Sequence, residues 1–230
     1  MKNLDVLVLG AFIIFGLQGC EKAKVVNNAS ADVFVKSTLN AQGTVVYAAV
    51  HSVFSYNIMT SVSVKSPAGT SMQLIDPQKN GNSFYNEPSD ADYSATPPLV
   101  GAYNYSVKYK DGEELSYTNS LSSATLAPAH ITSLVKSANS DSVYIYWDAI
   151  ATTNAYQLKI IKGTTQVLYQ PAFADASVPQ KQSLRYGFPI STLTSYGAGT
   201  FTFILNGLLF ETTDYIYLQA VSVATKDITL

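Results

Sequence analysis

Short runs of alternating apolar and polar residues recur along the chain and are broken by Gly, Pro, Asn and Asp. The clearest run covers residues 102–110, where three tyrosines and Val107 occupy every second position from 103 to 109. Successive side chains of a strand point to opposite faces, so this pattern predicts a half-buried β-strand. Asp111-Gly112 follows, and this pair tolerates the positive φ of a tight hairpin turn.

No apolar stripe at helical spacing occurs after the first 20 residues, so the pattern predicts an all-β protein built as sandwiches or barrels. A Pro at 128 between two strand-rich halves marks a boundary. We therefore expect two tandem Greek-key β-sandwiches, at residues 32–127 and 128–230. The predicted strands are 45–54, 58–65, 71–75, 102–110, 115–119, 123–126, a strand starting at 131, 142–148, a strand containing 156–160, 166–170, 184–190, 200–209 and 215–224, with a long loop at 80–98.

Two stretches resemble known sandwich families. The run Gly-x-Tyr-x-Tyr-x-Val-x-Tyr-x-Asp-Gly, residues 101–112, is similar to the late hairpin of bacterial Ig-like domains. In the second half, Trp147 ends an alternating strand, and Tyr156-x-Leu-x-Ile follows nine residues later. This spacing resembles strands B and C of fibronectin type III domains. The resemblance implies that both aromatic rings fill the space between the sheets, and that the later strands are C′, E, F and G.

The start of the chain resembles a bacterial lipoprotein signal peptide. Lys2 precedes an apolar stretch from Val6 to Phe15, and Leu17-Gln18-Gly19-Cys20 resembles a lipobox. The apolar stretch is too short to span a bilayer, which needs about 20 residues. The resemblance implies cleavage after residue 19, lipid attachment to Cys20 and a tether over residues 20–31. Glu21 is not the inner-membrane retention residue Asp, which implies sorting to the outer membrane, on the periplasmic face or the cell surface.

The composition argues against nucleic-acid binding and is typical of an extracytoplasmic β-protein. Only 13 % of residues are charged and the net charge is −2, so the chain offers no electrostatic footprint for nucleic acid. Sixteen tyrosines fit the half-buried faces of an extracytoplasmic β-protein. With one cysteine, no disulfide can form within the chain, so each sandwich must be stabilised by apolar burial.

Motifs for catalysis and metal binding are weak. His51 and His130 are the only histidines and lie far apart, whereas a zinc site needs three or four closely spaced ligands. Acidic residues in the 80–98 loop do not form a calcium-binding motif, and Asp and Pro are common in plain turns. We expect no catalytic residues, no metal and no cofactor, and hence not an enzyme.

Tyrosines are the remaining candidates for a binding site. If Val143, Ile145 and Trp147 point inward, the tyrosines between them point outward. If Ile216, Leu218 and Ala220 point inward, their neighbouring tyrosines also point outward. Long loops are often functional, which adds the tyrosines of the 80–98 loop. The candidate ligand-binding residues are Tyr144, Tyr146, Tyr215, Tyr217, Tyr85 and Tyr93.

The leading hypothesis is a non-catalytic, lipid-anchored binding, adhesion or spacer module of the cell envelope. Its partner would be a polysaccharide or another envelope protein, with the chain itself a monomer. One alternative is a fimbria-like structural subunit that polymerises by strand addition. A second alternative is an accessory to a glycan-degrading or uptake system.

Overall fold

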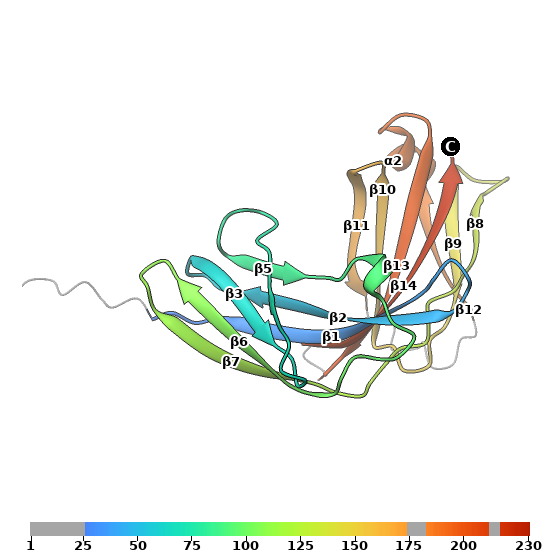
Figure 1. Cartoon of the computed structure of the whole chain (residues 1–230). Coiled ribbons are helices and arrows are strands. Elements are labelled where there is room, and N and C mark those ends of the chain that lie inside the picture. Colours follow the sequence, from blue (N-terminus) through green and yellow to red (C-terminus); the bar gives the residue numbers. More distant parts are fainter. Residues whose placement is uncertain (1–25, 174–182, 212–216) are drawn as a thin grey trace, which may run out of the picture.

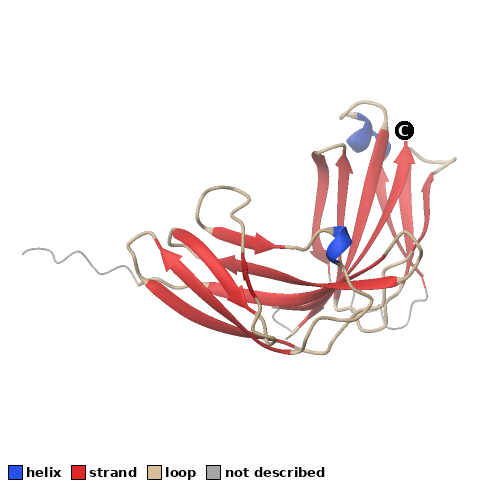
Figure 2. Cartoon of the chain, viewed as in Figure 1, coloured by secondary structure: helices blue, strands red, loops and turns tan. Residues whose placement is uncertain are grey.

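The computed structural model describes residues 26–173, 183–211 and 217–230. Almost all regular structure in these residues is β-strand (Figure 2), which confirms the predicted all-β class. The signal peptide, Cys20 and Tyr215 lie outside the described residues. Among the described residues, no helix is long and apolar enough to cross a membrane.

The first half contributes seven strands and one 3₁₀ turn: β1 (Ser30–Leu39), β2 (Val45–Phe54), β3 (Met59–Lys65), β4 (Ser71–Gln73), β5 (Ser83–Asn86), η1 (Asp90–Asp92), β6 (Gly101–Tyr109) and β7 (Glu114–Leu121). The second half contributes seven strands and a single helical turn: β8 (Ile131–Lys136), β9 (Ser142–Asp148), β10 (Ala155–Lys162), β11 (Thr165–Phe173), β12 (Ser183–Pro189), α2 (Ile190–Thr194), β13 (Thr200–Phe210) and β14 (Leu218–Thr229).

These strands form three sheets. A seven-stranded sheet has the order β11-β10-β13-β14-β1-β2-β5, and the two smaller sheets are β4-β3-β6-β7 and β12-β9-β8. The β1-β2-β5 end of the large sheet packs on the four-stranded sheet, and its β11-β10-β13-β14 end packs on the three-stranded sheet (Figure 1). In the second half, the strands predicted as B and E share one sheet, and those predicted as C′, C, F and G share the other, as in a Greek-key sandwich.

The two sandwiches are joined by strand pairing. β1 of the first half pairs in parallel with β14 of the second, from Val35 opposite Ala220 to Ser37 opposite Ser222. One sheet therefore runs through both halves, and the two sandwiches meet at an angle (Figure 1). The period-two pattern identifies strands but not their partners, so the sequence did not predict this pairing.

The segment between the halves is fixed at the same joint. Leu126 and Ala129 are almost fully buried. The Ser37 hydroxyl donates to the Leu126 carbonyl at 2.9 Å, and the Ser222 hydroxyl accepts the Ala129 N–H. Both serines are fully buried. Their hydrogen bonds satisfy backbone groups that would otherwise be buried without partners.

The core of the second sandwich follows the predicted alternation. Val143, Ile145 and Trp147 on β9 are at most 1 % exposed. The Trp147 ring meets that of Tyr156 edge-on, with ring centroids 5.5 Å apart. Tyr156 also accepts the Ile150 N–H at 2.8 Å. The two aromatic rings therefore lie between the sheets, as the fibronectin-like spacing implied.

The first sandwich buries a histidine. His51 on β2 is fully buried against Tyr103 and Tyr105. The Tyr105 hydroxyl donates to the Asp32 carbonyl at 2.9 Å, so it accepts from His51 Nδ1, 3.0 Å away. Burial lowers the pKa of His51 to about 4. This side chain is therefore a neutral member of the core.

Several local features differ from the sequence expectations. β1 was not among the predicted strands, and its first two residues fall within the predicted tether at 20–31. The predicted strand at 123–126 is not a strand in the structure. The segment predicted as a loop at 80–98 contains β5, which pairs with the end of β2. β14 has an irregularity where Leu209 pairs with Ala220 but Phe210 pairs with Leu218, so β14 carries one extra residue. This bulge places Leu218 and Ala220 on opposite faces, and the predicted shared inward face is wrong for this pair.

Candidate binding groove at the joint of the two sandwiches

A large concavity lies on the outer face of the seven-stranded sheet, where the two sandwiches meet. Two adjoining hollows of about 580 and 780 Å³ share Lys36, Ile204 and Val223. We call them together the joint groove. They occupy the inner corner between the first sandwich and the upright strands β10, β11 and β13 (Figure 1).

Strand alternation builds the floor of the groove. The inward residues of β13, Phe201, Phe203 and Leu205, fill the sandwich core. The side chains at alternate positions from 204 to 210 point the other way and face the groove, namely Ile204, Asn206, Leu208 and Phe210. A second, small apolar cluster forms part of this floor. In it, Leu208 of β13 is buried against Phe34 of β1 and Val221 of β14. The large sheet is thus packed with apolar side chains on both faces at the joint.

One wall of the groove is a row of polar side chains across three strands. Asn206 on β13 donates to the Gln157 carbonyl oxygen on β10 at 2.9 Å. Gln157 in turn donates to the Tyr169 hydroxyl on β11 at 2.7 Å. Asn206 is directly opposite Gln157 in the strand register, which explains the contact. The Tyr169 side chain is 50 % exposed, so its ring is accessible from the groove.

The opposite wall is organised by Glu87, which follows β5. Tyr85 donates to its Oε2 at 2.7 Å, and Tyr93 donates to its Oε1 at 3.1 Å. Lys36 from β1 forms an ion pair with the same carboxylate. The structure therefore brings the predicted residues Tyr85 and Tyr93 together around one acidic group and orients both rings toward the groove.

The electrostatics of this cluster keep Glu87 ionised. Burial alone would raise its pKa, but the hydrogen bonds from Lys36, Tyr85 and Tyr93 and the Lys36 charge outweigh it, so the pKa lies below its usual range. Burial and the adjacent Glu87 carboxylate raise the pKa values of both tyrosines. The phenols therefore stay protonated and act as donors.

The arrangement is suited to holding a ligand. Amide, ammonium and phenol groups line the walls, and apolar side chains form the floor, a combination typical of binding pockets. The Tyr169 hydroxyl accepts from Gln157, so its own proton can be donated to a ligand oxygen. Both Glu87 oxygens already accept strong hydrogen bonds, which makes this carboxylate a poor proton acceptor.

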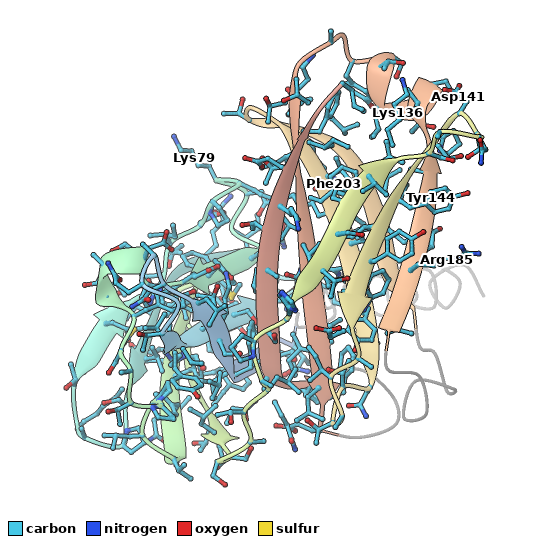
Figure 3. All side chains as sticks on the ribbon, turned by 90° about the vertical axis from the view of Figure 1, so that its right-hand side faces the viewer. Lys79, Lys136, Asp141, Tyr144, Arg185 and Phe203 are labelled. Carbon is cyan, nitrogen blue, oxygen red and sulfur yellow. The ribbon has the colours of Figure 1, made fainter. Side chains whose placement is uncertain are left out.

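Tyr144 and Tyr146 lie on a different surface, the outer face of the three-stranded sheet. Their ring centroids are 6.3 Å apart, and the Arg185 guanidinium lies over the Tyr144 ring at 5.7 Å (Figure 3). Gly187 is opposite Tyr144, and a Cβ there would meet the ring at 2.7 Å. The glycine therefore makes room for the ring to lie across β12. Both tyrosines point outward as predicted, but they are half-buried and far from the groove.

Tyr217 occupies a third place, beside the start of β1. Its hydroxyl accepts a long bond, 3.4 Å, from Ser30, and its side chain is 36 % exposed. It lines a hollow of about 330 Å³ with Tyr117 and Glu211. The predicted tyrosines thus divide among three surfaces, and Tyr215 lies outside the described residues.

The acidic residues in and near the 80–98 segment do not form a cluster. Asp90 and Asp92 lie in η1, and Asp92 accepts from Ser89 at 2.7 Å. Asp76 accepts the Gly81 N–H at 2.7 Å, so it closes its own turn. Within residues 26–173, 183–211 and 217–230, no group of three or more His, Cys, Asp or Glu residues is placed to hold a metal ion.

Sequence reasoning missed most groove residues, namely Lys36, Gln157, Lys159, Tyr169, Ile204, Asn206, Phe210 and Val223. A signal for them was present. Residues 203–205 and 207–210 are apolar or glycine at consecutive positions, a pattern typical of a strand covered on both faces. Such a strand implies that other side chains pack on its outer face. Here those side chains come from β1 and β14 at the joint.

Comparisons with known proteins give no family. No protein-family model matches the sequence, and no curated protein matches it significantly. Among solved structures, the chain is similar to one described as "Crystal structure of tetra-tandem repeat in extending region of large adhesion protein". The identity is 15 %, the TM-score 0.32, and the match covers 88 % of this chain and 50 % of the other. The chain thus spans about half that structure, and we infer neither fold nor function from so distant a likeness.

Proposed function

We propose that this chain is a non-catalytic binding module of the bacterial envelope, anchored to the outer membrane through lipid on Cys20. The joint groove would bind an envelope polysaccharide. The observation that carries the proposal is the groove itself: one continuous sheet fixes the walls contributed by the two sandwiches, and one of those walls is a hydrogen-bonded row ending in the Tyr169 ring.

The chemistry of the groove favours a sugar polymer as ligand. Sugars present hydroxyl groups around an apolar ring face, and the groove pairs amide and phenol groups with exposed aromatic carbon. Hydrolysis of a bound sugar by the usual glycosidase mechanism would require a second carboxyl group facing Glu87 across the groove. The other acidic residue of the groove, Asp90, is three positions along the same segment, so the two do not form an opposed pair.

Binding to a panel of bacterial envelope glycans, followed by titration calorimetry, tests this proposal. The double variant Gln157→Ala/Tyr169→Ala removes two contacts worth about 1 kcal/mol each, and should weaken binding roughly 30-fold. Tyr144→Ala/Tyr146→Ala is the matched control on the other surface and should bind normally. Equal loss in both variants would place the site elsewhere. Capture of a protein partner without any glycan signal would exclude the carbohydrate ligand.

Anchoring is tested separately. Mass spectrometry of the protein purified from membranes should find residue 20 as the first residue, carrying acyl chains. Two or three chains give stable anchoring, so Cys20→Ser should move the protein from the membrane pellet to the soluble fraction. An N-terminal peptide without acyl groups would contradict the lipoprotein assignment.

A further inference from the structure

The end of the first sandwich where the described chain begins carries an unusual group of exposed apolar side chains. Val26 is 81 % exposed, Phe54 46 %, Tyr56 91 % and Ile58 46 %. We call these four residues the apolar tip. They come from the start of the described residues, from the last residue of β2 and from the connection to β3, at the end of the first sandwich farthest from the second (Figure 1).

Ring packing and hydrogen bonds hold the tip in place. The Phe54 and Tyr56 rings pack edge-on with centroids 5.1 Å apart. The Asn57 amide donates to the Val26 carbonyl at 2.9 Å, which holds the start of the chain against the turn. Asn27 is 8 % exposed. Its amide donates at 2.8 and 2.7 Å to two carboxylates of the β6–β7 hairpin, Asp111 and Glu113.

The surface beside the tip carries polar side chains, with one cation and one carboxylate among them. A hollow of about 390 Å³ is lined by Tyr56 and Ile58 of the tip and by Asn27, Asn57, Lys110 and Asp111. Exposed apolar residues that gather in one place, rather than singly, mark an interaction surface. Tyrosine and other aromatic rings are enriched at the membrane–water interface, where apolar side chains of a peripheral protein also insert.

The position of Cys20 identifies what this surface faces. Val26 is six residues after Cys20 (26 − 20), and six residues span at most about 20 Å even when fully extended. An acyl chain on Cys20 would therefore hold the tip within about 20 Å of the lipid surface. At that distance a weak apolar contact becomes an intramolecular one, with a high effective concentration.

We propose that the apolar tip docks on the lipid bilayer. The docked tip sets how the module stands on the membrane, with the second sandwich and the joint groove directed away from it. This inference rests on the proposed lipidation of Cys20. It adds a second membrane contact, made by Phe54, Tyr56, Ile58 and Val26, which lipidation alone does not require.

The test uses the lipidated protein, purified from membranes and reconstituted in vesicles of phosphatidylethanolamine and phosphatidylglycerol. An environment-sensitive fluorophore is placed at the tip by Lys110→Cys or at the far end of the second sandwich by Lys136→Cys (Figure 3). Spin-labelled lipids should quench the tip probe at least three-fold more than the distant probe.

Proximity to the anchor could itself cause such quenching, so the decisive comparison changes the tip. Phe54→Ser/Tyr56→Ser in the Lys110→Cys background should remove most of the quenching. Val135→Ser/Tyr196→Ser exchanges two exposed apolar residues of the second sandwich, 45 % and 47 % exposed, and should have no effect. Quenching unchanged by the tip substitutions would overturn the proposal. If thermal unfolding shows that the double variant is misfolded, Tyr56→Ser alone replaces it.

Failure of the anchor can be told apart from failure of the tip. If mass spectrometry finds no acyl group on Cys20, the proposed anchoring is wrong, but the tip can still be tested by flotation of residues 20–230 carrying Cys20→Ser. This chain retains every described residue. Vesicle binding that is lost with Phe54→Ser/Tyr56→Ser supports docking, and no vesicle binding by the unsubstituted tip contradicts it.

Discussion

His51 and Asp32 both contact Tyr105, His51 through its ring and Asp32 through its backbone carbonyl. Their effects on stability in acid nevertheless have opposite signs. Burial lowers the pKa of His51 to about 4. For Asp32, burial outweighs the hydrogen bonds it accepts from Leu218 and Asn119 and raises the pKa to about 6. As the pH falls, the folded state takes up a proton less readily than the unfolded state at His51, and more readily at Asp32.

The His51 contribution can be isolated by His51→Phe, which keeps a ring against Tyr103. The contribution of His51 to the free energy of unfolding should fall by up to roughly 3 kcal/mol as the pH drops from 6.5 to 4, and then level off. The variant should lack that contribution. The measurement is urea unfolding of both proteins from pH 7 to pH 4, taken as a difference so that the Asp32 effect cancels. A constant difference across this range would contradict the assignment.

Gly187 provides a second test at the residue scale. A methyl group at this position would meet the Tyr144 ring at 2.7 Å, so Gly187→Ala should destabilise the fold by about 1–3 kcal/mol. Removing the ring relieves the clash, and the double variant Gly187→Ala/Tyr144→Ala should therefore lose much less than the sum of the single variants. Thermal unfolding of the full double-mutant cycle measures this coupling. Additive losses would mean that the two residues do not meet.

At the scale of elements, alternation in the sequence predicted most strands but missed β1, and it did not predict how the strands assemble. β6 and β9 show clean period-two patterns, so the inward set on β9 and the outward Tyr144 and Tyr146 could be predicted. β5 is only four residues long and lies in a Pro- and Asn-rich stretch, which hid it within a predicted loop. The bulge in β14 reversed the side-chain parity that the pattern assumed.

The candidate site was harder to predict than the strands, for a physical reason. Its residues come from β1, β10, β11, β13 and β14, and they meet only because β1 pairs with β14. Pairing across more than 180 residues depends on packing of the whole molecule, and its one local sign is the apolar outer face of β13. Tyr85 and Tyr93 could be predicted as candidates because they lie in a long predicted loop. The Glu87 carboxylate that binds both hydroxyl groups was not predicted.

The β14 strand yields a prediction at this scale. Ser222 is fully buried, and its hydroxyl accepts the N–H of Ala129 in the segment between the halves. Ser222→Ala leaves that buried donor unsatisfied and should cost about 1–3 kcal/mol of unfolding free energy. Ser120→Ala, at an exposed strand position of β7, should change stability by less than about 0.5 kcal/mol. Urea unfolding of both variants gives the comparison, and equal small effects would contradict the buried bond.

At the scale of the whole molecule, the shared sheet makes the two sandwiches one folded body. Domains joined only by a linker unfold independently, whereas here β14 is hydrogen-bonded to β13 on one side and to β1 on the other. A single continuous core also runs from β3 and β6 through Leu126 to β9 and β13. The joint groove has fixed walls only while this connection holds.

The most direct test of this account is pulsed hydrogen exchange with mass spectrometry across a urea series. It reports the unfolding midpoint of peptides from β3 and β6 and of peptides from β9 and β10 in the same sample. A shared sheet predicts that all of these peptides become exposed at one common midpoint. Two separate midpoints, one for each sandwich, would contradict a joint held by the pairing of β1 with β14. They would also contradict a groove whose two walls are fixed relative to each other.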